Sequence, residues 1–69
     1  MEASDRIEFE PVIAGCPSIH CYLDGYYVAR IALHADGCDL DGPLFRKGCR
    51  VEREEEAREL VRMAVRRRS

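Results

Sequence analysis

A chain of 69 residues is one domain at most, and its 11 basic and 13 acidic residues leave a formal net charge of −2. This near balance argues against bulk electrostatic binding to nucleic acid or to anionic membranes. The stretch Met1–Arg6 contains two acids and is followed by no apolar run, so we expect no secretory signal and no membrane span. The expected setting is the cytosol, where thiols are kept reduced.

The first two thirds of the chain predict an antiparallel sheet. Residues 6–10 alternate apolar with charged side chains, as in a half-buried strand, and Pro11 places that strand at a sheet edge. Residues 26–34, which are rich in aromatic and branched side chains, give the strongest strand pattern. Four of its side chains are predicted to share one face: Tyr27, Ala29, Ile31 and Leu33.

Two pairings of these strands are open. Asp24-Gly25 predicts a two-residue hairpin turn, with residues 18–23 as the partner strand of residues 26–34. Alternatively, residues 15–25 form one long loop, and the strand at 6–14 pairs directly with 26–34.

Further turns at Asp36-Gly37 and Asp41-Gly42 precede a candidate third strand at Leu44-Phe45 and a helix at about residues 53–67. The helix prediction rests on apolar residues at helical spacing: Ala57, Leu60, Val61, Ala64 and Val65. Glutamates in the first turn and arginines in the last complement the helix dipole. The predicted fold class is therefore α+β: a three-stranded antiparallel sheet within residues 6–46, with one C-terminal helix packed on a face. Residues 1–69 form a single small domain, of which 1–5 are expected to be disordered.

Three runs of the chain carry a family resemblance: residues 25–30 (Gly-Tyr-Tyr-Val-Ala-Arg), 45–48 (Phe-Arg-Lys-Gly) and 54–57 (Glu-Glu-Glu-Ala). Together they resemble small bacterial conserved hypothetical proteins, in which a Gly-aromatic strand precedes a Phe-x-x-Gly turn and an acidic helix start. Their strand–strand–strand–helix layout is similar to the second half of a double-stranded RNA-binding domain. The resemblance implies the fold over residues 6–67 and no RNA binding. Lysines meet phosphates at the start of the last helix in that domain, and here glutamates stand there.

Four cysteines in so short a chain are the main chemical signal, and one reading of them is a zinc site. The spacing Cys16-x4-Cys21-x12-His34-x3-Cys38 fits a tetrahedral site of thiolates and one imidazole. A zinc finger needs a helix that runs into its histidine, whereas the residues before His34 predict a strand. Zinc is therefore kept as an alternative.

Cys49 is the thiol with the clearest reason to be reactive. It lies between Arg46-Lys47 and Arg50, and neighbouring cations lower the pKa of a thiol and favour its thiolate. Such a site could exchange with oxidised glutathione, whose carboxylates would meet the three cations, while Cys16 or Cys21 could supply a resolving thiol. The alternative is that Cys49 is a small half-buried hydrophobe.

A third hypothesis concerns nucleic acid or protein recognition. Tyr22, Tyr26 and Tyr27 on a sheet, beside Arg30, could stack single-stranded bases. Core packing could equally explain a tyrosine, and the acidic balance disfavours nucleic acid. The sequence therefore predicts a binding or regulatory module rather than an enzyme. Thiol-based redox response through glutathione is the main hypothesis, with zinc or an interaction surface as alternatives. A second copy could pair across the Pro11 edge or the helix, and nothing in the sequence selects this.

Overall fold

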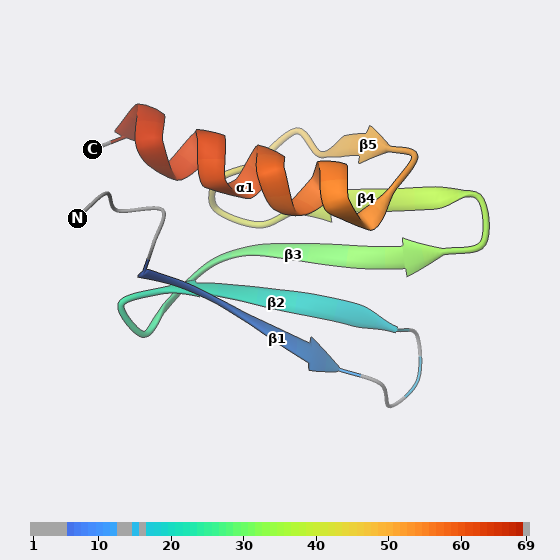
Figure 1. Ribbon diagram of the computed structural model, residues 1–69, viewed down its shortest axis with the longest axis horizontal. Helices are drawn as coiled ribbons and strands as arrows, with labels where there is room; N and C mark the ends of the chain where they lie inside the picture. The colour runs from blue at the N-terminus through green and yellow to red at the C-terminus, as the bar shows by residue number, and fades with distance from the viewer. Residues whose placement is uncertain (1–5, 13–14, 16, 69) are drawn as a thin grey trace.

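Five strands form a single antiparallel sheet, and one helix follows them. The computed structural model describes residues 6–12, 15 and 17–68. The elements are β1 (Ile7–Val12), β2 (Ser18–Leu23), β3 (Tyr26–His34), β4 (Gly37–Asp41), β5 (Cys49–Val51) and α1 (Glu54–Arg68). The strands lie side by side in chain order, β1-β2-β3-β4-β5 (Figure 1). Within the described residues, no helix is long and apolar enough to cross a membrane.

The α+β class, the antiparallel sheet and the C-terminal helix are confirmed, and the hairpin pairing is the one observed. β2 and β3 are joined by Asp24-Gly25, whose φ angles of 53° and 85° suit a tight hairpin turn. β1 pairs with β2, so the alternative in which it pairs directly with β3 is wrong. The observed helix, 54–68, lies within one residue of the predicted one.

The predicted number of three strands is wrong, because β4 and β5 were not expected. β5 also lies beyond residue 46, where the sheet was predicted to end, and Leu44-Phe45 belongs to the loop between β4 and β5. Turns flank β4 close to the predicted Asp-Gly positions, but Gly37 and Asp41 are themselves the first and last residues of the strand. Aspartates at alternate positions within β4 lower its intrinsic strand preference. Cross-strand partners compensate: Asp39 lies opposite Arg50, and Asp41 opposite Arg30.

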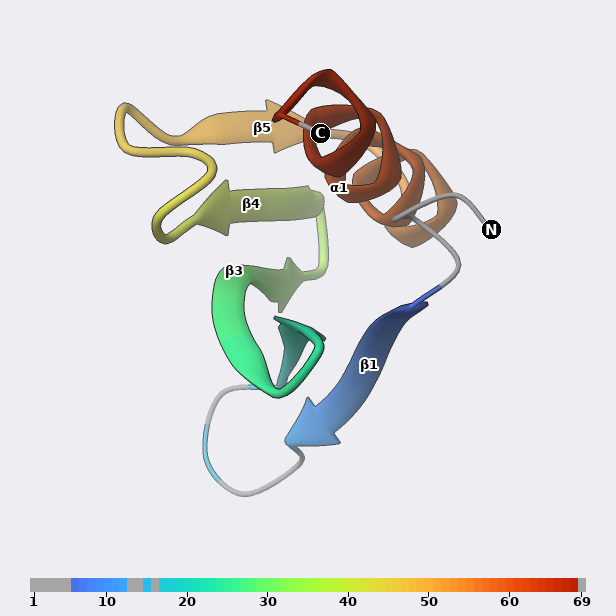
Figure 2. The same cartoon turned by 90° about the vertical axis from the view of Figure 1, so that its left-hand side faces the viewer.

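α1 covers one face of the sheet, and the core lies between them. The helix packs against β3, β4 and β5, and Figure 2 shows the sheet bending around it. Phe9 connects β1 to the same layer, because the guanidiniums of Arg58 and Arg62 lie 4.8 and 5.2 Å from its ring centroid. The buried core consists of Ile19, Cys21, Ala29, Ile31, Cys38, Leu40, Ala57, Val61 and Val65.

A β-bulge near the β2–β3 turn changes which face one tyrosine occupies. Cys21 lies opposite Ala29, but the next residue, Tyr22, lies opposite Tyr27, so β3 contains one extra residue at this point. The bulge removes Tyr27 from the face that Ala29 and Ile31 share. The prediction that Tyr27 lies on the same face as Ala29, Ile31 and Leu33 is therefore wrong for that residue.

Candidate binding surface

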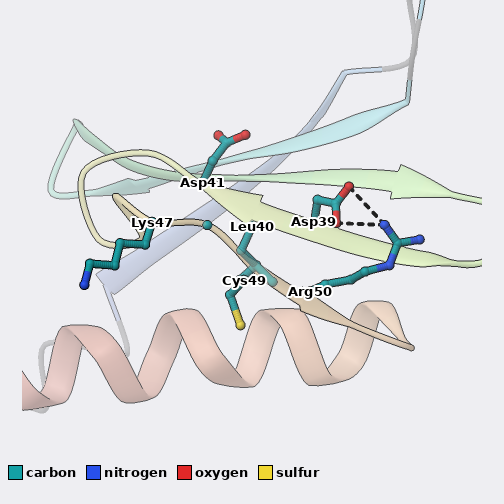
Figure 3. Close-up of a pocket in the computed structure, with 7 residues that line it drawn as sticks. Asp39, Leu40, Asp41, Lys47, Cys49 and Arg50 are labelled. Carbon is teal, nitrogen blue, oxygen red and sulfur yellow. Dashed lines mark hydrogen bonds and ion pairs between the residues drawn. The ribbon is translucent and has the colours of Figure 1, made fainter.

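The predicted thiol site lies where the β4–β5 loop enters β5. An open hollow of about 410 Å³ is lined there by Asp39, Leu40, Asp41, Lys47, Gly48, Cys49 and Arg50 (Figure 3). Two of the three predicted cations thus line the same hollow as Cys49. The third, Arg46, is exposed and does not line it.

Strand alternation separates the Cys49 thiol from the Arg50 guanidinium. Cys49 lies opposite the buried Leu40 and its sulfur points toward α1, whereas Arg50 lies opposite Asp39 on the other face (Figure 3). Arg50 binds the carboxylates of Asp36 and Asp39 at 2.9 and 3.1 Å. Its charge is therefore directed to these acids and away from the sulfur. Lys47 is the cation of this hollow that has no carboxylate partner among the described residues.

Of the two thiols predicted to resolve a disulfide at Cys49, the one that the structure describes, Cys21, lies far from it. Cys16 lies outside the described residues. Cys21 belongs to β2, three strands away from β5, which corresponds to about 14 Å at the usual strand spacing. It is fully buried, and burial raises the pKa of its thiol to about 11 although Arg58 acts in the opposite direction. Of the cysteines that the structure describes, Cys49 is the exposed one.

The predicted zinc ligands do not converge either. Cys21 and Cys38 are buried on the helix face, and Cys16 lies outside the described residues. His34 lies opposite Gly37, one position along from the Leu33–Cys38 pair, so it points to the other face of the sheet. There its Nε2 lies 3.0 Å from a carboxylate oxygen of Asp39. Across the described ranges, no three His, Cys, Asp or Glu side chains could together hold a metal ion.

Polar and aromatic side chains of the strands lie on the face of the sheet away from α1, which we call the open face. Its side chains alternate with those of the core, and strand register places them in rows. One row crosses four strands, from Glu10 through His20 and Arg30 to Asp41. The open face carries Glu8, Glu10, His20, Tyr22, Tyr27, Arg30, His34, Asp39, Asp41 and Arg50.

Three rings meet on the open face, and we call His20, Tyr22 and Tyr27 the aromatic cluster. The Tyr27 ring lies edge-to-face with both others, 5.9 Å from His20 and 6.0 Å from Tyr22 between centroids. Tyr27 remains 41% exposed, so the cluster is accessible from solvent. Tyr26, which is 77% exposed, was expected to join the tyrosines and is absent from these ring contacts.

His20 was not predicted from the sequence to belong to this cluster. The signal for it was present in the alternation of residues 18–23, because His20 and Tyr22 alternate with the buried Ile19 and Cys21. No sequence signal placed Tyr27 beside them, because that depends on the bulge.

The charges around the cluster are predominantly negative. Four carboxylates lie on the open face with two guanidiniums, those of Arg30 and Arg50. Arg30 donates to Asp41 at 2.7 Å, whereas neither Glu8 nor Glu10 has an ion-pair partner among the described residues. Partial burial, followed by the charge of Asp41, raises the pKa of the Tyr27 phenol, so this hydroxyl stays protonated at neutral pH.

Comparison with protein-family models, with curated proteins and with solved structures gave no match. The resemblance to small bacterial proteins with a layout similar to part of the double-stranded RNA-binding domain therefore stays a prediction.

Proposed function

We propose that this protein is an interaction module that binds a protein partner through the open face of its sheet. The observation that carries the proposal is the asymmetry of the two faces. α1 covers one face, while the other presents the exposed Tyr27 ring, which contacts His20 and Tyr22, among carboxylates. Exposed aromatic side chains on a rigid sheet give large contact area with little loss of side-chain entropy, and tyrosine is enriched at interfaces for this reason.

The chemistry of this surface supports binding more than catalysis. The hollow beside Cys49 is open, and its Asp39 and Arg50 side chains are paired with each other. Ser18 and His20 share a face, but within the described residues the His20 side chain forms no hydrogen bond with Ser18 or with its cross-strand neighbour Glu10, so no nucleophile–base pair is present. We place the module in the cytosol as part of the same proposal, because its free cysteines suit a reducing compartment.

Site-specific photo-cross-linking tests the proposal. Benzoylphenylalanine at position 22 keeps an aromatic side chain on the open face, and the same group at Met63, which is 39% exposed on α1, is the matched control. In the cells that produce the protein, we expect a discrete cross-linked species from position 22 at several times the yield from position 63. Equal yields from both positions, or adducts from position 63 alone, would contradict the proposal.

A thiol function at Cys49 is the second candidate, favoured by the exposure of this thiol next to Lys47. Under this proposal, Cys49 attacks the disulfide of oxidised glutathione, forms a mixed disulfide and releases one glutathione thiolate. Incubation with oxidised glutathione, followed by intact-mass analysis, should give one adduct that Cys49→Ser abolishes. The absence of an adduct in the folded wild-type protein would end this candidate.

A further inference from the structure

We propose that the aromatic cluster is a recognition site for an arginine side chain in an extended segment of the partner protein. This inference deepens the proposed function and rests on it. It assigns the class of partner, a basic segment, and the residues that recognise it: the rings of Tyr22 and Tyr27 with the carboxylates of Glu8 and Glu10.

The rings of the aromatic cluster are steeply inclined to one another. The plane of the Tyr27 ring is inclined by 71° to that of His20 and by 65° to that of Tyr22. The rings are therefore arranged edge-to-face and are not stacked in parallel. A tyrosine face carries negative quadrupole density, which attracts a cation within about 6 Å of the ring centroid. A planar guanidinium on one of these faces keeps its N–H edges free to donate to neighbouring acids.

Carboxylates of β1 lie beside the aromatic cluster. Glu8 lies directly opposite Tyr22 and Glu10 directly opposite His20, so two carboxylates of β1 border the cluster. Both are exposed, and neither forms an ion pair within the described part of the chain. On the other border, Asp41 already holds the guanidinium of Arg30 at 2.7 Å. The same face thus binds one guanidinium from its own chain and presents two further acceptors for another.

Charge complementarity decides between a basic peptide and nucleic acid. Bases could stack on these rings, but their phosphates would have to lie near Glu8 and Glu10, where like charges repel. A segment that contains arginine is attracted instead, because the positive charge of its guanidinium interacts with the carboxylates while the planar group lies on a ring. Lysine would gain the charge attraction but would lose the planar stacking.

The test is an NMR titration of the full chain with three probes: an Arg-Gly repeat peptide, a Lys-Gly peptide of equal length and an oligouridylate. We expect the Arg-Gly peptide to shift the resonances of the aromatic cluster and of β1, with affinity that falls as salt is raised. Tyr22→Ala should weaken this binding about tenfold, and a combined Glu8→Gln and Glu10→Gln variant about threefold. Both carboxylates are exposed, so the double variant is expected to fold normally.

Each other result overturns the inference in its own way. Equal affinity of the Lys-Gly peptide would show that guanidinium stacking does not contribute to recognition. Stronger binding of oligouridylate would show that the open face is a nucleic-acid surface. Shifts confined to α1, or no shifts with any probe, would refute recognition of arginine at the cluster. The proposed function is judged separately, by the comparison of cross-linking at positions 22 and 63.

Discussion

The two faces of the sheet are built from alternate residues of the same strands, yet they differ in almost every property. On β3, Ala29 and Ile31 are fully buried under α1, while Arg30 between them is exposed and bound to Asp41. The helix face is apolar, and two of its buried members are thiols, Cys21 and Cys38. The open face holds rings and carboxylates. This small domain therefore places its core contacts on one face of the sheet and leaves the side chains of the other face without a covering element among the described residues.

The bulge at Tyr27 is where this division departs from simple alternation. Without it, Tyr27 would lie under α1 with Ala29 and Ile31, and the open face would lose the ring that contacts both others. One extra residue in β3 therefore creates the aromatic cluster. Bulges commonly reorient a side chain next to a functional site, which agrees with the role proposed here.

The largest contrast between the faces is expected in stability. Ile31→Ala should lower the free energy of unfolding by about 2–5 kcal/mol, because it removes a fully buried side chain and leaves a cavity. Arg30→Ala, the neighbouring residue on the open face, should lower it by less than about 1 kcal/mol, because an exposed ion pair contributes little. Urea denaturation measures both. If Ile31→Ala does not fold, Ile31→Val should still show a loss of about 1 kcal/mol. A loss for Arg30→Ala as large as that for Ile31→Ala, or clearly larger than that for Ile31→Val, would contradict the division of roles.

The buried thiol of Cys21 should make stability depend on alkaline pH. Its pKa is raised from 9.0 to about 11 in the folded protein, so the unfolded chain releases this proton first. The contribution is fully present below pH 9 and is lost as pH rises toward 11. At pH 10 the wild-type protein should have lost about 1 kcal/mol more than Cys21→Ala, relative to pH 8. Urea denaturation under reducing conditions at the two pH values measures the difference. A parallel pH dependence of the two proteins would show that burial does not perturb this thiol.

On the open face, the smallest expected effect is electrostatic. Asp41 adds to burial in raising the pKa of the Tyr27 phenol, so Asp41→Asn should lower that pKa while burial keeps part of the elevation. The ring resonances of Tyr27, followed by NMR through alkaline pH, report the change. Asp24→Asn, at the β2–β3 turn where Asp24 pairs with Arg6, is the matched control and should leave Tyr27 unaffected. An equal effect of both variants would mean that Asp41 does not act on Tyr27 specifically.

Much of the fold could be predicted because local signals agreed with the tertiary structure. The Asp24-Gly25 turn, the branched run of β3 and the helical spacing of α1 each determined an element. β4 and β5 were missed because they form through partners that are distant in the sequence: Cys38 and Leu40 of β4 are buried in the core, and Asp39 lies opposite Arg50 of β5. Local propensity contains no information about such pairs.

The candidate site was less predictable, because adjacency in sequence is not adjacency in space. Arg50 follows Cys49 directly, and this suggested a cationic thiol site, but strand alternation places the two side chains on opposite faces. His20 and Tyr22 could be assigned to one face from their period of two. Tyr27 could not, because a bulge is a property of the pairing of two strands.

Two adjacent tyrosines give the sharpest test of arginine recognition at the aromatic cluster. Tyr27 belongs to the aromatic cluster, whereas Tyr26 is more exposed and is absent from its ring contacts. The measurement is the affinity of the Arg-Gly peptide for Tyr27→Ala and Tyr26→Ala, with Tyr27→Phe to retain the ring. We predict binding about tenfold weaker for Tyr27→Ala and near wild-type binding for the other two. Equal loss in Tyr26→Ala and Tyr27→Ala, or no loss in either, would contradict the account.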